Sequence, residues 1–205
     1  INGPLYAGKK IDFIDNKINS INADYEKVLN KLTKKDVLYL THLNGKCGYD
    51  RNIFNILKKR KIFVIEDASQ ALLVKDFKND YLGTKFDIGC FSLSYTKMLN
   101  MIYGGFCVTN NNNIAKHLRT IRNNGVDNNL QIASSIGGNF KPNDINVLFG
   151  LNSINKIHQI KSKLIKIYRF YKKNLKNKNI SLIKYDNLKK EFPTYIEVLT
   201  NNRKK

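Results

Sequence analysis

Residues 91–110, FSLSYTKMLNMIYGGFCVTN, place a lysine, Lys97, between two apolar segments. The residues before Lys97 are typical of a buried strand, and the paired glycines Gly104 and Gly105 lead into a second strand. Lysine side chains are mostly exposed in folded proteins. Lys97 at the exit of a core strand is therefore either an ordinary exposed turn residue or a residue with a chemical role.

Short apolar segments and helical patterns alternate on both sides of this stretch. The alternation predicts an α/β domain with a largely parallel sheet, and the apolar run IFVI is typical of a strand covered by helices on both faces. We expect strands at residues 11–15, 36–43, 61–67, 88–94 and 104–110. We expect helices at residues 22–32, 50–60 and 112–125, the last with a glycine stop.

The C-terminal part of the chain has a different pattern. Apolar residues recur at helical spacing through residues 142–176, which predicts one long helix, and the segments ISLIKY and TYIEVLT indicate two further strands. We therefore divide the chain into a partial large domain, residues 1–155, and a linking helix with the beginning of a small domain, residues 156–205.

The composition restricts the class of protein. A hydrophobic fraction of 42% predicts a folded core, and no apolar run is long enough for a membrane span. Three cysteines without paired or metal-type spacing indicate a reducing compartment, so we expect a cytoplasmic protein without a metal site. The chain opens without Met or a signal pattern, which suggests that it begins inside a longer protein.

The net charge of +20 is open to two interpretations. The positive charge could allow the protein to bind a polyanion such as nucleic acid, because Lys and Arg neutralise its phosphate groups. However, Lys, Asn and Ile are all abundant along the whole chain, as in NNNNI and KKNLKNKNI, which indicates a compositional bias. We favour the bias, because nucleic-acid modules usually concentrate their charge on one face.

Two further polar residues lie at or near the ends of predicted strands. Asp67 comes at the end of the strand in VIEDASQA, and Ser92 lies in the strand before Lys97. Ligands of open α/β sheets bind outside the carboxyl ends of the strands, although Asp67 could instead be a helix N-cap. A carboxylate, a hydroxyl and an amine at one edge suit pyridoxal phosphate, whose aldehyde binds lysine and whose ring nitrogen pairs with a carboxylate.

Four segments in this order resemble the DegT/StrS-type sugar aminotransferases. They are VIEDASQAL, GTKFDIGCFSLSYTK, GGFCVTN and IGGNFKPNDINVLFGLNSINKI, and the likeness extends over about residues 11–171. The resemblance implies a pyridoxal-phosphate enzyme with the three-layer α/β/α large domain of the aspartate-aminotransferase fold (fold type I).

The resemblance also implies a role for individual residues. Lys97 would form a Schiff base with pyridoxal 5'-phosphate and later move a proton, and Asp67 would pair with the ring nitrogen. Gln70 would lie beside the ring and its 3-hydroxyl, and Ser92 would contact the phosphate. Asn139 would reach the cofactor of a neighbouring subunit, which implies a homodimer with shared active sites.

His42, in THLNG, also matches a family histidine at a strand end. We interpret His42 as structural.

Lysine at position 97 favours transamination within that family, because some relatives carry histidine there and catalyse dehydration or deoxygenation. An amino-acid donor, usually glutamate, would supply an amino group to a keto group of a nucleotide-linked sugar for polysaccharide or lipopolysaccharide synthesis. A dehydratase of the same family and a noncatalytic basic module that binds polyanions remain alternatives.

The sequence departs from the family pattern in two ways. Ile102 and Tyr103 stand where the family commonly has Gly-Glu before the paired glycines. The N-terminal phosphate-binding loop of the family and most of its small domain have no counterpart in these residues. We therefore expect a fragment, truncated at both ends, that binds the cofactor weakly by itself.

Overall fold

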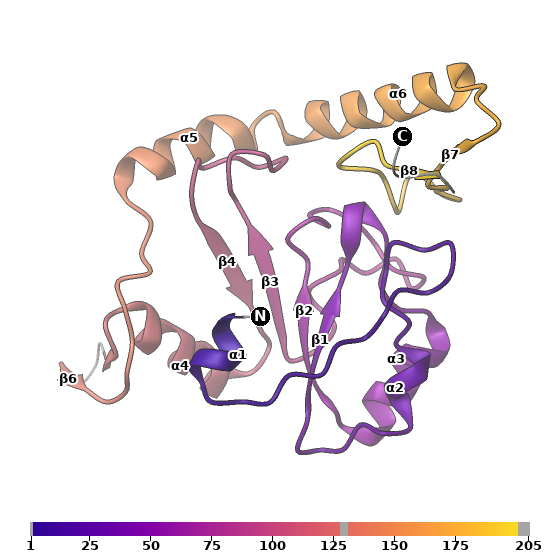
Figure 1. The fold of residues 1–205 in the computed structure, drawn as a ribbon. Coiled ribbons are helices and arrows are strands. Elements are labelled where there is room, and N and C mark those ends of the chain that lie inside the picture. The colour runs from indigo at the N-terminus through magenta and orange to yellow at the C-terminus, as the bar shows by residue number, and fades with distance from the viewer. Residues whose placement is uncertain (1, 128–130, 201–205) are drawn as a thin grey trace.

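The computed structural model describes residues 2–127 and 131–200 and has a four-stranded sheet at its centre (Figure 1). Strands β1 (Val37–Thr41), β2 (Phe63–Asp67) and β3 (Ile88–Ser92) are parallel, and β4 (Gly105–Val108) is antiparallel to β3. The strand order is β1-β2-β3-β4. The predicted fold class, an α/β domain with a mainly parallel sheet, is confirmed.

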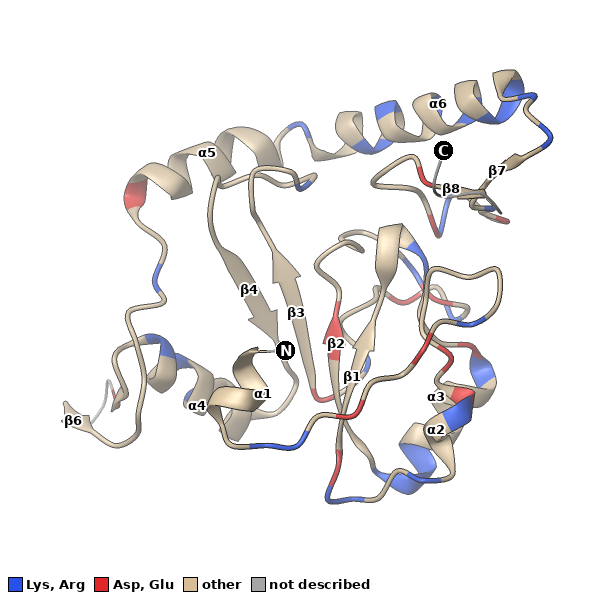
Figure 2. Ribbon diagram, viewed as in Figure 1, with Lys and Arg blue, Asp and Glu red and all other residues tan. Residues whose placement is uncertain are grey.

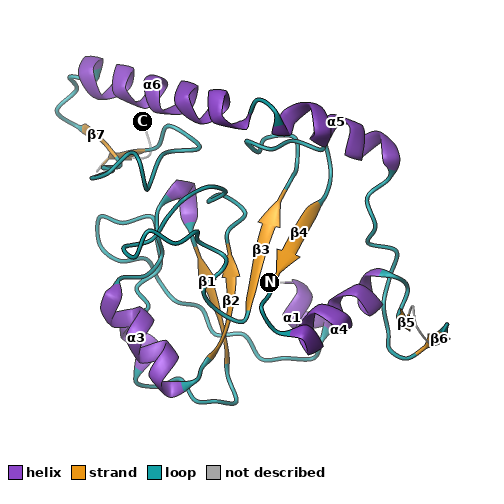
Figure 3. Cartoon of the chain, turned by 180° about the vertical axis from the view of Figure 1, so that it is seen from behind, coloured by secondary structure: helices purple, strands orange, loops and turns teal. Residues whose placement is uncertain are grey.

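The remaining elements surround this sheet (Figures 1 and 3). They are α1 (Asn2–Tyr6), α2 (Glu26–Leu29), η1 (Leu43–Gly45), α3 (Arg51–Arg60), α4 (Asn112–Arg122), β5 (Val126–Asp127), β6 (Ile132–Ala133), α5 (Asp144–Ile154), α6 (Ile157–Asn174), β7 (Ile180–Leu182) and β8 (Val198–Thr200). Helices α2 and α3 lie beside β1 and β2, whereas α5 and α6 run across the end of the sheet where β3 finishes.

Helix α3 shows why local sequence signals succeed here. The Asp50 side chain caps the helix by accepting a hydrogen bond from the backbone N–H of Ile53 (2.9 Å). Ile53, Phe54 and Leu57 form the buried face, and three basic residues in the last turn favour the helix dipole. The predicted helix at 50–60 is confirmed to within one residue.

The two faces of the sheet differ in burial. Leu38 and Leu40 of β1, Val64 of β2 and Phe91 of β3 belong to the main hydrophobic core. The alternate residues, such as Tyr39 and Ile65, lie on the other face and are partly exposed. Successive side chains of a strand point to opposite faces, so one face of the sheet packs in the core and the other face stays partly exposed.

Three predicted elements are wrong or need correction. Residues 11–15 form no strand, because their only ladder contact nearby is the isolated bridge between Asn16 and Ala23. The predicted helix at 22–32 is reduced to α2, and the guanidinium of Arg60 donates to the carbonyl oxygens of Leu29, the last residue of α2, and of Leu32 beyond it.

The predicted long helix is two helices, α5 and α6, separated at residues 155–156. The sequence around the break, NSINK, is rich in Asn and Ser, whose side chains compete for backbone hydrogen bonds. The Ser153 hydroxyl illustrates this competition, because its one proton can be donated either to the carbonyl oxygen of Phe149 (3.0 Å), one turn earlier in α5, or to that of Asn100 (3.1 Å). The predicted helix at 112–125 is confirmed as α4, which ends at Arg122 before Gly125.

Within residues 2–127 and 131–200, the basic residues lie on helices and loops, and none is on strands β1–β4 (Figure 2). Within the described part of the chain, no helix combines the length and the apolar character that a membrane crossing requires.

The C-terminal segment, residues 180–200, packs into the same core as the sheet. Phe192 is fully buried in the main cluster, while Tyr168, Ile183 and Tyr185 form a second, smaller cluster. The predicted domain boundary at residue 155 stays a prediction. The two parts approach closely at Gly45, where an added Cβ would lie 1.8 Å from the carbonyl oxygen of Phe192.

We expect Gly45→Ala to lower the free energy of unfolding by about 3 kcal/mol, because Gly45 has φ +71 and no room for a methyl group. Urea unfolding followed by circular dichroism measures the change. Gly3→Ala is the matched control, since nothing lies within 4 Å of its added Cβ. Equal stability of the two variants would contradict the close packing of the C-terminal segment on Gly45.

Candidate active site

Two adjoining cavities lie at the carboxyl ends of β2 and β3. The larger, about 310 Å³, is lined by Tyr39, Ile65, Asp67, Ser69, Cys90, Phe91, Ser92 and Gly104. The smaller, about 110 Å³, is lined by residues that include Gln70, Lys97, Thr194 and Tyr195. Ser69 and Ser92 line both cavities. The structure thus brings together four of the five predicted site residues, namely Asp67, Gln70, Ser92 and Lys97.

The fifth predicted residue, Asn139, lies elsewhere. It is exposed, forms a backbone bridge with Asn123 just after α4, and lines neither cavity. Its predicted role in a neighbouring subunit stays a prediction.

Asp67 ends β2 on the open face of the sheet. Its Oδ1 accepts a hydrogen bond from the backbone N–H of Ser69 (3.0 Å), and turns rather than a helix follow it. The alternative interpretation of Asp67 as a helix N-cap is therefore wrong. Its carboxylate lies on the wall of the larger cavity, where a cationic ring nitrogen could pair with it.

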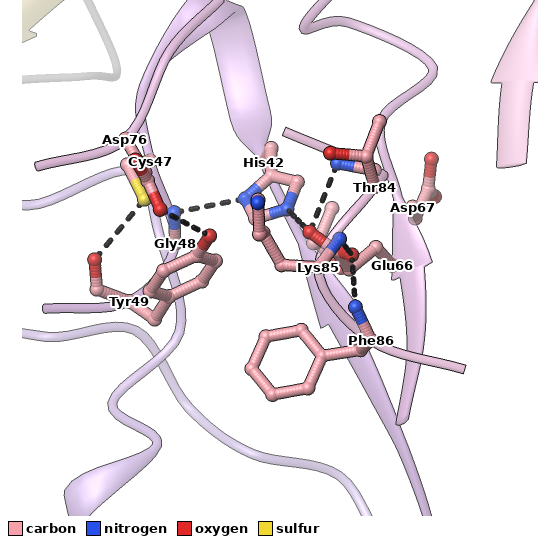
Figure 4. A network of polar contacts seen from close by, with 12 residues as sticks. His42, Cys47, Gly48, Tyr49, Glu66, Asp67, Asp76, Thr84, Lys85 and Phe86 are labelled. Carbon is pink, nitrogen blue, oxygen red and sulfur yellow. Dashed lines mark hydrogen bonds and ion pairs between the residues drawn. The ribbon is translucent and has the colours of Figure 1, made fainter. Parts of the chain in front are cut away.

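The neighbouring carboxylate, that of Glu66, points to the opposite side of β2 (Figure 4). It is fully buried and accepts hydrogen bonds from the backbone N–H groups of Gly83 (2.9 Å), Lys85 (2.9 Å) and Phe86 (3.0 Å). The Nε2 atom of His42 lies 3.1 Å from Glu66 Oε1. Glu66 therefore joins the end of β1 to the loop that leads into β3.

His42 occupies a defined tautomer in this network. Its Nδ1 accepts a hydrogen bond from the backbone N–H of Gly48 (3.0 Å), so the proton is on Nε2, which donates to Glu66. The ring is fully buried. These contacts support the structural interpretation of His42.

The pKa of Glu66 lies below its ordinary value of 4.5. Burial on its own raises the pKa, but the hydrogen bonds from His42 and from the backbone of Gly83 and Phe86 outweigh burial. Glu66 is accordingly a stabilising anion that faces away from the cavities.

Gln70 is fixed by a residue that the sequence did not single out, Asn44. The backbone N–H of Asn44 donates to Gln70 Oε1 (2.9 Å), and the N–H of Gly45 donates to the Gln70 carbonyl oxygen (2.9 Å). With Oε1 engaged in this way, the Nε2 group of Gln70 is the end left to donate to a ligand.

The side chain of Asn44 continues this contact to the C-terminal segment. Its Oδ1 accepts from the backbone N–H groups of Thr194 (2.9 Å) and Tyr195 (2.7 Å) and from the Thr194 hydroxyl (3.0 Å), and its Nδ2 donates to the Tyr195 carbonyl oxygen (3.0 Å). Asn44 is fully buried in a left-handed conformation that asparagine tolerates.

Thr194 and Tyr195 line the cavity of Lys97, and sequence analysis missed both. No local signal marks them, because their contact with the site spans about 150 residues of chain through Asn44.

Lys97 lies in the loop between β3 and β4 and is half-buried. Among residues 2–127 and 131–200, no carboxylate forms an ion pair with its ammonium group. Its amine is therefore available to a ligand in the smaller cavity.

The same loop contains the departure from the family pattern. Ile102 has φ +66, a left-handed conformation that is costly for a β-branched residue. Two hydrogen bonds hold it there, from the Ile102 N–H to Asn100 Oδ1 (2.7 Å) and from the Tyr95 N–H to the Ile102 carbonyl oxygen (3.0 Å). The turn at Ile102 thus has a backbone conformation that favours glycine.

The residues present fit pyridoxal phosphate. Asp67 offers an anion for the ring nitrogen, Gln70 a donor for a ring oxygen, and Lys97 an amine for the aldehyde. The hydroxyl groups of Ser69 and Ser92, where the two cavities meet, suit phosphate oxygens.

The sequence profile of the DegT/DnrJ/EryC1/StrS aminotransferase family matches residues 2–205. The chain belongs to this family. Over 197 residues it is 30% identical to UDP-4-amino-4,6-dideoxy-N-acetyl-beta-L-altrosamine transaminase of Campylobacter jejuni, with 92% of this chain and 52% of the relative covered. The chain thus spans about half the length of that relative.

Solved structures of the family have the same fold. An aminotransferase of Brucella abortus superposes with a TM-score of 0.83 at 21% identity, covering 97% of this chain and 55% of the other. GDP-4-keto-6-deoxy-D-mannose-3-dehydratase of E. coli, with bound hydrated PLP, superposes with a TM-score of 0.76 at 19% identity, covering 98% and 56%. The predicted family is confirmed.

We expect Glu66→Gln to lower the free energy of unfolding at pH 7 by about 3 kcal/mol, because the amide presents a donor to N–H groups that need an acceptor. The folded-state pKa of Glu66 is lowered, so its contribution is complete above about pH 5 and declines as the pH falls below 4.5. Urea unfolding at several pH values, from about 3 to about 7, measures the difference in the free energy of unfolding between Glu66→Gln and the unchanged chain.

The exposed Glu26 of α2 provides the matched control, Glu26→Gln. Glu66→Gln and the unchanged chain should become more similar in stability as the pH falls. A difference that stays constant down to low pH would contradict the lowered pKa of Glu66.

We expect Ile102→Gly to raise the free energy of unfolding by about 1 kcal/mol, because glycine adopts φ +66 without steric cost. Ile102→Val is the control, since valine keeps the branched Cβ and should give no gain. Thermal unfolding compares the two variants. A loss of stability in Ile102→Gly would show that the packing of the isoleucine outweighs its backbone strain.

Proposed function

We propose that the protein is a pyridoxal-phosphate-dependent aminotransferase that transfers an amino group from an amino acid, with glutamate as the expected donor, to a keto group of a nucleotide-linked sugar. The observation that carries this proposal is the placement of Lys97, Gln70 and Ser92 around one cavity that adjoins Asp67. Membership of the aminotransferase family supports it.

Each residue of the site has a distinct task in this proposal. When bound, pyridoxal phosphate supplies an electron sink for the reacting carbon. The Lys97 amine would hold the cofactor and would serve as the group that moves a proton at the substrate carbon. The Asp67 carboxylate would face the ring nitrogen, Gln70 would donate to the ring oxygen, and Ser92 would bind the phosphate.

The partner of this site would be a second copy of the chain. Asn139 lies apart from the cavities, which suits a residue that serves the neighbouring subunit's cofactor. A homodimer in the cytoplasm that makes amino sugars for surface polysaccharides is the setting that we propose.

Dehydration of a keto nucleotide sugar is the second candidate reaction. A dehydratase structure superposes on this chain, so the fold is compatible with dehydration, but the shared fold does not distinguish the two reactions. Lys97 favours transamination, because its amine can both bind the cofactor and return a proton.

Glutamate labelled with ¹⁵N distinguishes the two reactions, since only transamination passes the nitrogen of glutamate to the sugar. Mass spectrometry of the sugar product detects that transfer.

We expect Lys97→Ala to abolish the near-visible absorption band that develops when pyridoxal phosphate joins a lysine, because the amine at the smaller cavity is lost. Borohydride reduction followed by peptide mapping should locate the cofactor on Lys97 in the unchanged chain. Asp67→Asn should weaken this labelling about tenfold or more, because the ring nitrogen loses its counter-charge.

The exposed Lys10 supplies the control for nonspecific reaction of surface lysines, through Lys10→Ala. The assignment of Lys97 would be overturned by a band that survives Lys97→Ala, or by equal labelling of Lys97 and Lys10.

A further inference from the structure

Three side chains on the open face of the sheet lie in one row across three strands. Asp67 of β2 is the register neighbour of Cys90 on β3, and Cys90 is the register neighbour of Cys107 on β4. The Sγ atoms of Cys90 and Cys107 are 3.8 Å apart. The proposed function uses Asp67 but gives neither thiol a task.

The ladder between β3 and β4 brings these two cysteines close together. The Leu93 N–H donates to the Gly104 carbonyl oxygen (2.9 Å), and this pair continues the register of Cys90 with Cys107. Hydrogen-bonded and non-hydrogen-bonded pairs alternate in an antiparallel ladder, so Cys90 and Cys107, three positions further, form a non-hydrogen-bonded pair. The Cα atoms of such pairs are about 4.5 Å apart, which lies within the range that disulfides span.

The two thiols also differ in reactivity from the third cysteine. The hydrogen bond from Cys90 lowers the pKa of Cys107 to about 7, whereas the same contact raises the pKa of Cys90. Cys107 is exposed, so its thiolate can meet a reagent. Burial raises the pKa of Cys47, whose Sγ donates to the Tyr49 carbonyl oxygen (3.1 Å).

We propose that Cys90 and Cys107 are a dithiol site that small-molecule disulfides, such as oxidised glutathione, convert to a cross-strand disulfide. The Cys107 thiolate attacks one sulfur of glutathione disulfide, so a protein–glutathione bond forms and one glutathione thiolate leaves. Cys90 then releases its proton to solvent and its sulfur attacks Cys107, which forms the protein disulfide and releases the second glutathione. The two protein thiols lose two electrons, and glutathione disulfide gains them.

The site bears on the cavity described above, although its oxidation does not depend on the proposed function. Cys90 lines the larger cavity together with Asp67. A bond from Cys90 to Cys107 moves the Cys90 sulfur toward β4 and covalently fixes β4 to the strand that carries Ser92.

The test treats the reduced, folded chain with oxidised glutathione, stops the reaction with acid, removes the glutathione, and then counts the thiols with Ellman's reagent in denaturant, where all three cysteines can react. We expect two of the three thiols to disappear, a mass lower by two hydrogen atoms, and one disulfide-linked pair of peptides that contains Cys90 and Cys107. Cys47→Ser should show the same disulfide, because Cys47 takes no part.

Single substitutions separate the two steps. Cys90→Ser should accumulate a stable glutathione adduct on Cys107, because no second thiol resolves it, and Cys107→Ser should form no disulfide. The alkylation rate of Cys107 by iodoacetamide should be half-maximal near pH 7 in the unchanged chain and at a higher pH in Cys90→Ala, which removes the hydrogen-bond donor. Cys90 is the titratable neighbour of Cys107 across the ladder, and Asp67 lies one strand further, beside Cys90, on this face of the described sheet.

Two results would overturn the proposal. One is a glutathione adduct on Cys107 that persists while Cys90 is present, which would mean that Cys90 cannot reach it. The other is equal oxidation of Cys47, Cys90 and Cys107, which would mean that no specific site exists. Circular dichroism before and after treatment establishes that each variant remains folded during the comparison.

Discussion

The fully buried carboxylate of Glu66 is the constraint on which the site depends. Burial of an unpaired carboxylate would cost several kcal/mol, so every oxygen must find a donor. Those donors come from His42 at the end of β1 and from the loop at residues 83–86 before β3. One anion therefore fixes the relative positions of three chain segments at the carboxyl edge of the sheet (Figure 4).

The same constraint decides where Asp67 points. Adjacent residues of a strand face opposite sides of the sheet, so a buried Glu66 directs Asp67 to the open face. The parallel register places Cys90 beside Asp67, and Ser92 follows two residues later on the same face. Thus one face of β2 and β3 provides packing and charge stabilisation, while the other presents the groups that can bind a ligand.

Local patterns in the sequence predicted most of the elements that position the site. The strands ending at Asp67 and Ser92, the helix after Asp50 and the exit position of Lys97 all follow from short-range signals such as apolar runs and caps. Residues 11–15 have the same apolar pattern but form no strand, because a strand needs a partner that local sequence does not reveal. The break between α5 and α6 depends on backbone competition by Asn and Ser, which a count of apolar spacing ignores.

The resemblance to the family implies a glycine at position 102, but it does not give the backbone conformation of the isoleucine that stands there. The φ of +66 is visible only in the structure, because no local pattern marks Ile102 as left-handed.

The least predictable part of the site is the wall that faces Lys97. Thr194 and Tyr195 come from the C-terminal segment, and Asn44 binds both of them while its backbone holds Gln70. A shift of the C-terminal segment must therefore either break the contacts of a fully buried amide or move the Gln70 side chain with it. Because an unsatisfied buried amide is costly, the second response is favoured, and the shape of the lysine cavity is coupled to a segment about 150 residues away from Asn44.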